Sequence, residues 1–184
     1  MEEIFIVTGN DHKWNEINNK LSKKINHIKF KRKILKLDEI QGSEEEIIKH
    51  KAIQAFKKLK KPCIIEDVSF GFKELNYFPG PYIKHFMKKV DTSNFYKLFK
   101  NKKARATCTI ALIKSLNNVE IFQGQVYGNI VKKRKDNGFD FDRIFVPEGH
   151  NLAYSEMSIE EKNKISHRSK ALNKLIKKLN HSNL

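Results

Sequence analysis

The sequence has 184 residues and carries 37 Lys and Arg against 21 Asp and Glu, which is a formal net charge of +16. Hydrophobic residues make up 39% and include 13 Phe, so the chain can bury a core and is too apolar for a disordered tail. No apolar run approaches the roughly 20 residues of a membrane span, and the two cysteines form no CxxC pair, which excludes a disulfide framework. We expect a cytoplasmic, globular protein with no membrane partner.

The first half of the chain alternates strands and helices. Residues 4–7 form a continuous apolar run, which predicts a strand buried on both faces and followed by Thr8-Gly9-Asn10. A helix should come next, and then a short strand over residues 27–31. Ser43 begins a capping box, which predicts a second helix. Residues 63–65 predict another buried strand that closes on Glu66-Asp67.

The second half predicts short helices, a hairpin and a long terminal helix. Two short helices are expected after Pro79-Gly80-Pro81, and a long hairpin should turn at Asn117-Asn118. A loop is expected around residues 136–138. Ser158 begins a second capping box, and the last helix carries a leucine-rich face. Alternating strands and helices together with an antiparallel hairpin predict an α/β protein with a mixed sheet.

The high positive charge is compatible with nucleic-acid binding, because Lys and Arg neutralise phosphates. Only five of the basic residues are Arg, however, and the Lys are spread along the whole chain. Arg is the residue suited to bidentate recognition of bases and phosphates, whereas Lys is a strongly hydrated point charge. A solvated Lys-rich surface is the favoured interpretation, and a basic nucleic-acid-binding protein without catalysis stays as the alternative.

Two predicted strands are followed by polar groups where ligands gather in open α/β sheets. Thr8-Gly9-Asn10 leads into a helix, and such a turn points backbone N–H groups at an anion, with Lys13 adding charge. It is not a Walker A loop, and an ordinary strand–helix turn is the alternative.

The carboxylates Glu66 and Asp67 are costly at the end of an apolar strand unless they are solvated, paired or metal-bound. Glu39 could approach them from another segment. Carboxylates without a His or Cys cluster suit Mg²⁺, which takes one or two of them plus phosphates. The alternative is that the two acids cap a neighbouring loop. Lys51 lies within the apolar arc of its helix, where it would meet phosphate or simply extend its charge to solvent.

A polar cluster near the C-terminus could recognise a base. Ser166 is a helix N-cap candidate, and His167 and Arg168 supply donors beside Lys162. Phe139 or Phe141 could stack on a base, and Asp142 could accept from a ring N–H. Core packing is the alternative for both phenylalanines. The histidines show no zinc spacing.

Taken in order, these motifs resemble the inosine triphosphate pyrophosphatase family over residues 4–179. The matching blocks are Thr8-Gly9-Asn10 with Lys13, Glu39-Ile40-Gln41-Gly42 with Lys51, Glu66-Asp67, Phe78-Pro79-Gly80-Pro81-Tyr82, Gly138-Phe139-Asp140-Phe141-Asp142, Tyr154-Ser155-Glu156-Met157, and residues 161–168 with Ala171.

The resemblance implies an elongated mixed sheet flanked by helices, with two lobes and a central cleft, in a single domain over residues 1–184. It implies Mg²⁺-dependent hydrolysis of ITP, dITP and XTP to the monophosphate and pyrophosphate, with Mn²⁺ as a possible substitute. A nucleotide pyrophosphatase with another base preference is the nearest alternative. The family is usually homodimeric and needs no nucleic acid.

The resemblance also implies roles for individual residues. Glu39 and Asp67 would bind the metal, and Asp67 would activate the attacking water. The phosphates would be held by Thr8, Gly9, Asn10, Lys13 and Lys51. The base and ribose would be bound by Val68, Phe139, Asp140, Phe141, Asp142, Lys162, Ser166, His167 and Arg168.

Two positions depart from the family pattern. Many relatives read Gly-Phe-Gly-Trp-Asp-Pro where this chain has residues 138–143, so Asp140 and Arg143 add charge and remove the Gly and Pro geometry. Many bacterial relatives have Ser or Thr after the metal aspartate, whereas Val68 cannot donate a side-chain hydrogen bond. Both departures bear on base choice more than on phosphate chemistry.

Overall fold

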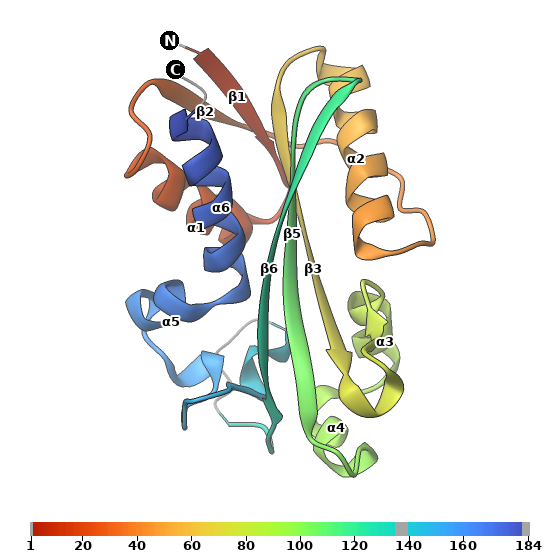
Figure 1. The fold of residues 1–184 in the computed structure, drawn as a ribbon. Helices are drawn as coiled ribbons and strands as arrows, with labels where there is room; N and C mark the ends of the chain where they lie inside the picture. The colour runs from red at the N-terminus through yellow and green to blue at the C-terminus, as the bar shows by residue number, and fades with distance from the viewer. Residues whose placement is uncertain (1, 135–139, 182–184) are drawn as a thin grey trace. The chain divides into compact units, whose positions relative to one another are not determined.

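A computed structural model describes residues 2–134 and 140–181, and its ribbon is drawn in Figure 1. The helices of this part are α1 (Asp11–Ser22), α2 (Glu44–Leu59), α3 (Ile83–Lys89), α4 (Thr92–Leu98), α5 (Ile159–Ile165) and α6 (His167–His181). The strands are β1 (Glu2–Val7), β2 (Ile28–Lys33), β3 (Cys63–Phe72), β4 (Phe78–Gly80), β5 (Lys103–Ser115), β6 (Asn118–Ile130) and β7 (Phe145–Pro147). The predicted α/β class is confirmed. None of the described helices combines the length and apolar character needed to cross a membrane.

The described strands form a mixed seven-stranded sheet in the order β2-β1-β3-β5-β6-β7, with β4 paired to β3. Strand β1 runs parallel to both β2 and β3, and helices α1 and α2 make the crossovers that parallel neighbours require. The pairings of β3 with β4 and of β6 with β7 are antiparallel. The mixed sheet predicted from the sequence is therefore confirmed.

Strand β3 continues beyond the point where the sequence predicted its end. It does not close on Glu66 and Asp67 but extends to Phe72. The extension is stabilised because Phe70 and Phe72 are fully buried and pair in register with β4. The hairpin prediction was also one residue off, since β6 begins at Asn118 and the turn comes just before it.

Both predicted capping boxes are present, and they fix where α2 and α5 begin. The carboxylate of Glu46 accepts from the backbone N–H of Ser43 at 2.8 Å, and the Ser43 hydroxyl accepts from the backbone N–H of Glu46 at 3.3 Å. Ser158 and Glu161 repeat the arrangement. Hydrogen bonds from the backbone and hydroxyl of Ser43 hold the pKa of Glu46 below its usual value.

The chain groups into two compact units. The first unit contains Met1–Asp67, Thr109–Gln123 and Lys170–Leu184, and the second contains Val68–Cys108 and Gly124–Ser169. In the first unit, α2 packs against one face of the strands, and Figure 1 shows α1 and α6 on the opposite face. Its core on the α2 side comprises Val7, Ile48, Ala52, Ala55, Cys63, Ile65, Ala111 and Ile113.

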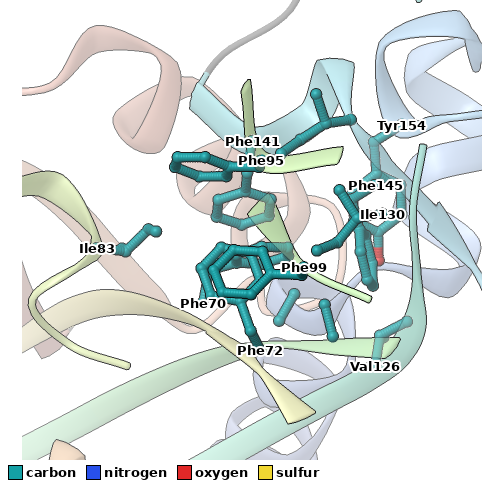
Figure 2. Close-up of a cluster of buried hydrophobic side chains, with 13 residues drawn as sticks. Phe70, Phe72, Ile83, Phe95, Phe99, Val126, Ile130, Phe141, Phe145 and Tyr154 are labelled. Atoms are coloured by element: carbon teal, nitrogen blue, oxygen red, sulfur yellow. The ribbon is translucent and has the colours of Figure 1, made fainter. Parts of the chain in front are cut away.

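The second unit is built around an aromatic cluster (Figure 2). The rings of Phe70 and Phe141 are stacked with their centroids 4.2 Å apart, and Phe72 stacks on Phe99 at the same distance. Phe145 meets Phe70 edge-on at 5.3 Å. Stacked and edge-to-face pairs are the favoured geometries of aromatic rings and add to the energy of burial. Many of the chain's phenylalanines therefore serve this core.

A tight turn joins β3 to β4 in the second unit. Asn76 and Tyr77 both have positive φ angles, of 51° and 64°. The backbone carbonyl oxygen of Tyr77 lies so close to Gly71 that a Cβ at Gly71 would be 1.9 Å from it. Only glycine fits this approach, which lets the chain fold back and pair β4 with the end of β3.

Candidate active site

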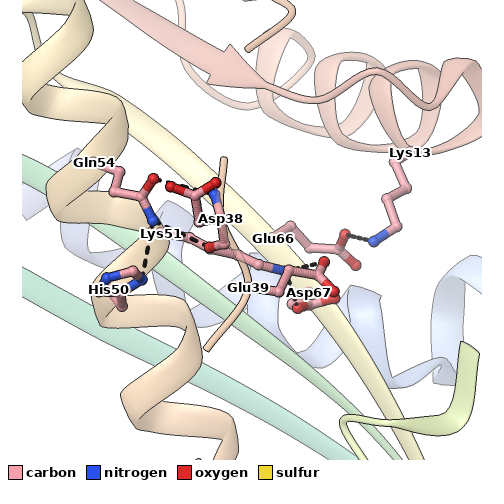
Figure 3. A network of polar contacts seen from close by, with 8 residues as sticks. All are labelled: Lys13, Asp38, Glu39, His50, Lys51, Gln54, Glu66 and Asp67. Carbon is pink, nitrogen blue, oxygen red and sulfur yellow. Dashed lines mark hydrogen bonds and ion pairs between the residues drawn. The ribbon is translucent and has the colours of Figure 1, made fainter. Parts of the chain in front are cut away.

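The centre of the candidate site is Lys51, which lies between two carboxylates in the first unit (Figure 3). Its Nζ donates to Oε1 of Glu39 at 2.8 Å and to Oδ2 of Asp67 at 2.7 Å. Lys51 is only 8% exposed and comes from the buried face of α2. Burial alone would lower the pKa of Lys51, but its ion pairs with Asp67 and Glu39 outweigh that effect and raise it.

Glu66 and Asp67 point to opposite faces of the sheet, because neighbouring side chains alternate along a strand. Asp67 meets Lys51 of α2, whereas Glu66 forms an ion pair with Lys13 of α1 at 2.7 Å (Figure 3). The Glu66 side chain is 2% exposed and that of Asp67 is 29% exposed. The two adjacent acids therefore do not form one site, and the carboxylate that shares Lys51 with Asp67 is Glu39.

The turn of residues 8–10 has the geometry predicted for the start of a helix. The Asn10 side chain caps α1 by accepting from the backbone N–H of Lys13 at 3.1 Å. The Thr8 hydroxyl accepts from the backbone N–H of Asn10 at 3.1 Å. These contacts order the turn, and they occupy the side-chain oxygens of Thr8 and Asn10.

Arg32 of β2 is a structural residue of this turn that sequence reasoning missed. Its Nε donates to the backbone carbonyl of Thr8 at 3.1 Å, and its guanidinium pairs with Asp11 at 2.7 Å. Ile6 and Arg32 are register partners, which places Arg32 beside the end of β1. Parallel pairing of the first two strands was the only signal that could have located it.

The second unit holds a separate polar cluster around Lys162 of α5. Lys162 Nζ donates to Oδ2 of Asp142 at 2.5 Å and lies 5.4 Å from the centre of the Tyr154 ring. Asp142 is 7% exposed and Tyr154 is 2% exposed. Burial, reinforced by the negative charge of Asp142, raises the pKa of Tyr154 well above its usual value.

The predicted base residues that the structure describes lie around this cluster. Phe141 and His167 are buried, with ring centres 5.8 Å apart, and Arg168 is half-buried. Ser166 caps α6, as predicted, by accepting from the backbone N–H of Ser169 at 3.1 Å. Val68 packs against the aromatic core.

Two predicted residues lie outside this description. Phe139 belongs to the residues that the structure does not describe, and nothing is described of the Asp140 side chain.

Glu39 and Asp67 satisfy the donor chemistry that Mg²⁺ requires. Their oxygens already converge on one cation, the ammonium of Lys51, so the two carboxylates are held close together. Among the described residues no group of three or more His, Cys, Asp or Glu could hold a metal ion. Mg²⁺ commonly takes only one or two protein carboxylates and completes its octahedron with water and phosphate oxygens. The residues present therefore fit this metal better than one that needs a protein cage.

The family of the chain follows from comparison with known proteins. The chain matches the Ham1 family over residues 4–178. It is 37% identical over 95% of its length to a protein named inosine triphosphate pyrophosphatase from Schizosaccharomyces pombe, and the match covers 94% of that protein. A protein of the same name from Yarrowia lipolytica is 40% identical, with 94% and 93% of the two chains covered.

A solved structure supports the same assignment. The fold matches a HAM1 protein from Coxiella burnetii with a TM-score of 0.85 and 27% identity, covering 98% of this chain and 100% of that one. The chain belongs to the Ham1 family.

Proposed function

We propose that this protein is a Mg²⁺-dependent pyrophosphohydrolase of non-canonical purine nucleoside triphosphates such as ITP, dITP and XTP. The observation that carries the proposal is the convergence of Glu39 and Asp67 on the buried Lys51, in a chain related over nearly its whole length to proteins named inosine triphosphate pyrophosphatase. The products would be the nucleoside monophosphate and pyrophosphate.

The first unit would carry the phosphate chemistry. Glu39 and Asp67 would hold the metal, which when bound would neutralise phosphate charge and orient the attacking water. Asp67 would accept the proton of that water as a general base. Lys51 would contact a phosphate oxygen, and the turn of residues 8–10 would orient the first backbone N–H groups of α1 toward the phosphates. Positioning and charge neutralisation are the main requirements of phosphoryl transfer.

The second unit would carry base recognition. His167 and Arg168 would supply donors for a 6-oxo group, and Asp142 would accept from a ring N–H. A 6-amino group would leave those donors without acceptors, and a pocket built on hydrogen bonds can reject such an analogue by about 10⁴-fold. Phe139, Asp140, Phe141, Lys162, Ser166 and Val68 complete the proposed base and ribose set.

The wider proposal concerns how the enzyme works in the cell. It would cleanse the nucleotide pool as a cytoplasmic homodimer acting from a single domain, and it would accept Mn²⁺ in place of Mg²⁺. Its partner would be the free nucleotide rather than a nucleic acid. Sedimentation analysis tests the dimer, because a monomeric species at all concentrations would contradict it.

The test is a panel of ITP, dITP, XTP, ATP and GTP with Mg²⁺, in which pyrophosphate and orthophosphate are measured separately. We expect pyrophosphate release with a marked preference for the first three nucleotides. Orthophosphate as the main product would contradict cleavage between the α and β phosphates.

A variant in the second unit tests base recognition. Arg168→Ala should reduce the preference for ITP over ATP, whereas Lys164→Ala, at an exposed position on α5, should leave the ranking unchanged. An unaltered ranking in Arg168→Ala would favour a pyrophosphatase whose base choice depends on other residues.

A further inference from the structure

The segment that carries Glu39 has no regular secondary structure, although the proposed function needs its carboxylate in a fixed place. Residues 34–42 connect β2 to α2 without forming a helix or a strand. The Glu39 side chain is 52% exposed, so packing does not hold it. Leu35 and Leu37 pack against the core of the first unit, but Asp38 and Glu39 that follow are exposed. Polar contacts must therefore position the backbone directly beside Glu39.

One stripe of α2 contacts this segment. His50, Gln54 and Lys58 are spaced four residues apart, so they lie along the same face of the helix. Lys58 Nζ donates to the backbone carbonyl of Lys36 at 2.6 Å. Gln54 binds the backbone of Asp38, the residue directly before Glu39. The segment is therefore fixed to the same helix that carries Lys51.

The amide of Gln54 makes a two-point contact with Asp38 (Figure 3). Its Oε1 accepts from the backbone N–H of Asp38 at 3.1 Å, and its Nε2 donates to the backbone carbonyl of Asp38 at 3.1 Å. The same Nε2 lies 3.0 Å from Nδ1 of His50. An amide nitrogen can only donate, so His50 Nδ1 is the acceptor, and this contact fixes the orientation of the Gln54 amide.

We propose that Gln54 is a positioning residue for the metal ligand Glu39. By holding both backbone groups of Asp38, Gln54 places the Glu39 carboxylate beside Lys51, whose Nζ lies 2.8 Å from Oε1 of Glu39. Lys51 lies about one helical turn before Gln54 on α2. This inference rests on the proposed function for its catalytic consequence, but the contact itself is independent of any activity. Partners that orient a metal ligand typically contribute 10- to 100-fold to metal affinity or activity.

The experiment compares Gln54→Met and Gln54→Glu with the unaltered protein. Met keeps the length and helix preference of the side chain but removes both hydrogen bonds. Glu keeps an acceptor for the Asp38 N–H and cannot donate to the Asp38 carbonyl or to His50. Lys58→Met and Lys57→Met form a matched pair. Both lysines are exposed on α2, but of the two only Lys58 donates a hydrogen bond to the described segment of residues 34–42.

Three measurements are made on each variant: hydrogen exchange of the Asp38 amide in the metal-free protein, Mn²⁺ binding by calorimetry, and the Mg²⁺ dependence of ITP turnover. In Gln54→Met, the Asp38 amide should lose its protection from hydrogen exchange, and the Kd for Mn²⁺ should rise by about 10-fold or more. Saturating Mg²⁺ should restore most of kcat. In all three measurements, Gln54→Glu should fall between Gln54→Met and the unaltered protein. Lys57→Met should match the unaltered protein.

Unchanged Asp38 exchange and unchanged Mn²⁺ affinity in Gln54→Met would overturn the proposal. A loss of thermal stability that accounts for all the changes, in Gln54→Met and in Gln54→Glu alike, would also overturn it. If the unaltered protein does not hydrolyse ITP, the proposed function fails, while the exchange and Mn²⁺ measurements still decide whether Gln54 orders the segment. The two failures are therefore distinguishable.

Discussion

Replacing Asp67 by Asn separates the chemical role proposed for this carboxylate from its structural role. The substitution keeps the volume of the side chain and an oxygen that can accept from Lys51 Nζ. In the unaltered protein, Lys51 Nζ lies 2.7 Å from Oδ2 of Asp67. It removes the negative charge and the ability to take up a proton from water. Lys51 keeps its second ion pair, with Glu39 at 2.8 Å, so its buried charge is not left alone.

The expected loss of stability is small. The hydrogen bond from the Lys51 ammonium to the amide oxygen keeps its charged donor, so the main loss is the attraction between opposite charges. That attraction is worth up to about 1 kcal/mol for solvent-exposed pairs, so the exchange should cost about 1 kcal/mol. Asp67 is less than one third exposed, so solvent screening reduces this figure only modestly. A loss of that size lowers the Tm of a chain this long by about 2–4 °C.

The expected loss of activity is much larger. A general base contributes about 10²–10⁴-fold, and loss of a metal ligand adds to this, so pyrophosphate release should fall by at least about 10³-fold. That factor corresponds to about 4 kcal/mol of transition-state stabilisation. The difference between about 1 and about 4 kcal/mol is what identifies a chemical role.

The assay measures pyrophosphate release from ITP at saturating Mg²⁺, together with urea unfolding of the same samples. Asp38→Asn is the matched control, because it makes the same charge change at the exposed residue beside Glu39. Activity of Asp67→Asn within tenfold of the unaltered protein would refute the assignment. A stability loss above about 3 kcal/mol would refute the view that the pair with Lys51 is dispensable for folding.

Three further outcomes test other parts of the structure. Gly71→Ala should destabilise the protein by at least about 3 kcal/mol in urea unfolding, because its Cβ would lie 1.9 Å from the Tyr77 carbonyl oxygen; a smaller loss would show that the turn can relax. Burial raises the pKa of the Cys63 thiol to about 12, so a thiol reagent at pH 8 should modify Cys63 only after denaturant is added. The stabilising effect of Glu46 should be complete above its ordinary pKa of 4.5 and should disappear as the pH falls through its lower folded value; a Glu46→Gln variant that is equally less stable at pH 7 and pH 3 would contradict this.

Local signals in the sequence predicted those features that depend on neighbouring residues. Ser43 and Ser158 locate the starts of α2 and α5, because a capping box satisfies backbone donors within four residues. The burial of Lys51 follows from its place within the apolar arc of α2, since the helical repeat alone sets which face a residue occupies. The α/β class follows from the alternation of such elements.

Features that depend on distant residues could not be predicted in the same way. Gln54 looks like an ordinary polar residue on a helix until the segment of Asp38 is placed against it. The extension of β3 to Phe72 depends on β4, which is only three residues long and follows a turn with positive φ angles. Propensity cannot identify so short a strand, because its stability comes from pairing and burial. The roles of the base residues and the extent of a single domain stay predictions.

The sidedness of Glu66 and Asp67 explains why two adjacent acids can have different roles. An acidic dipeptide in a strand sends one carboxylate to each face of the sheet, and each face here is covered by a helix that supplies a lysine. Glu66, at 2% exposure, is suited to anchoring Lys13. Asp67, at 29% exposure, is paired yet still accessible to water. Asp67 is accessible to water and shares its contact with Lys51 with Glu39. Both properties favour Asp67, rather than Glu66, as the carboxylate for the proposed metal binding and proton transfer.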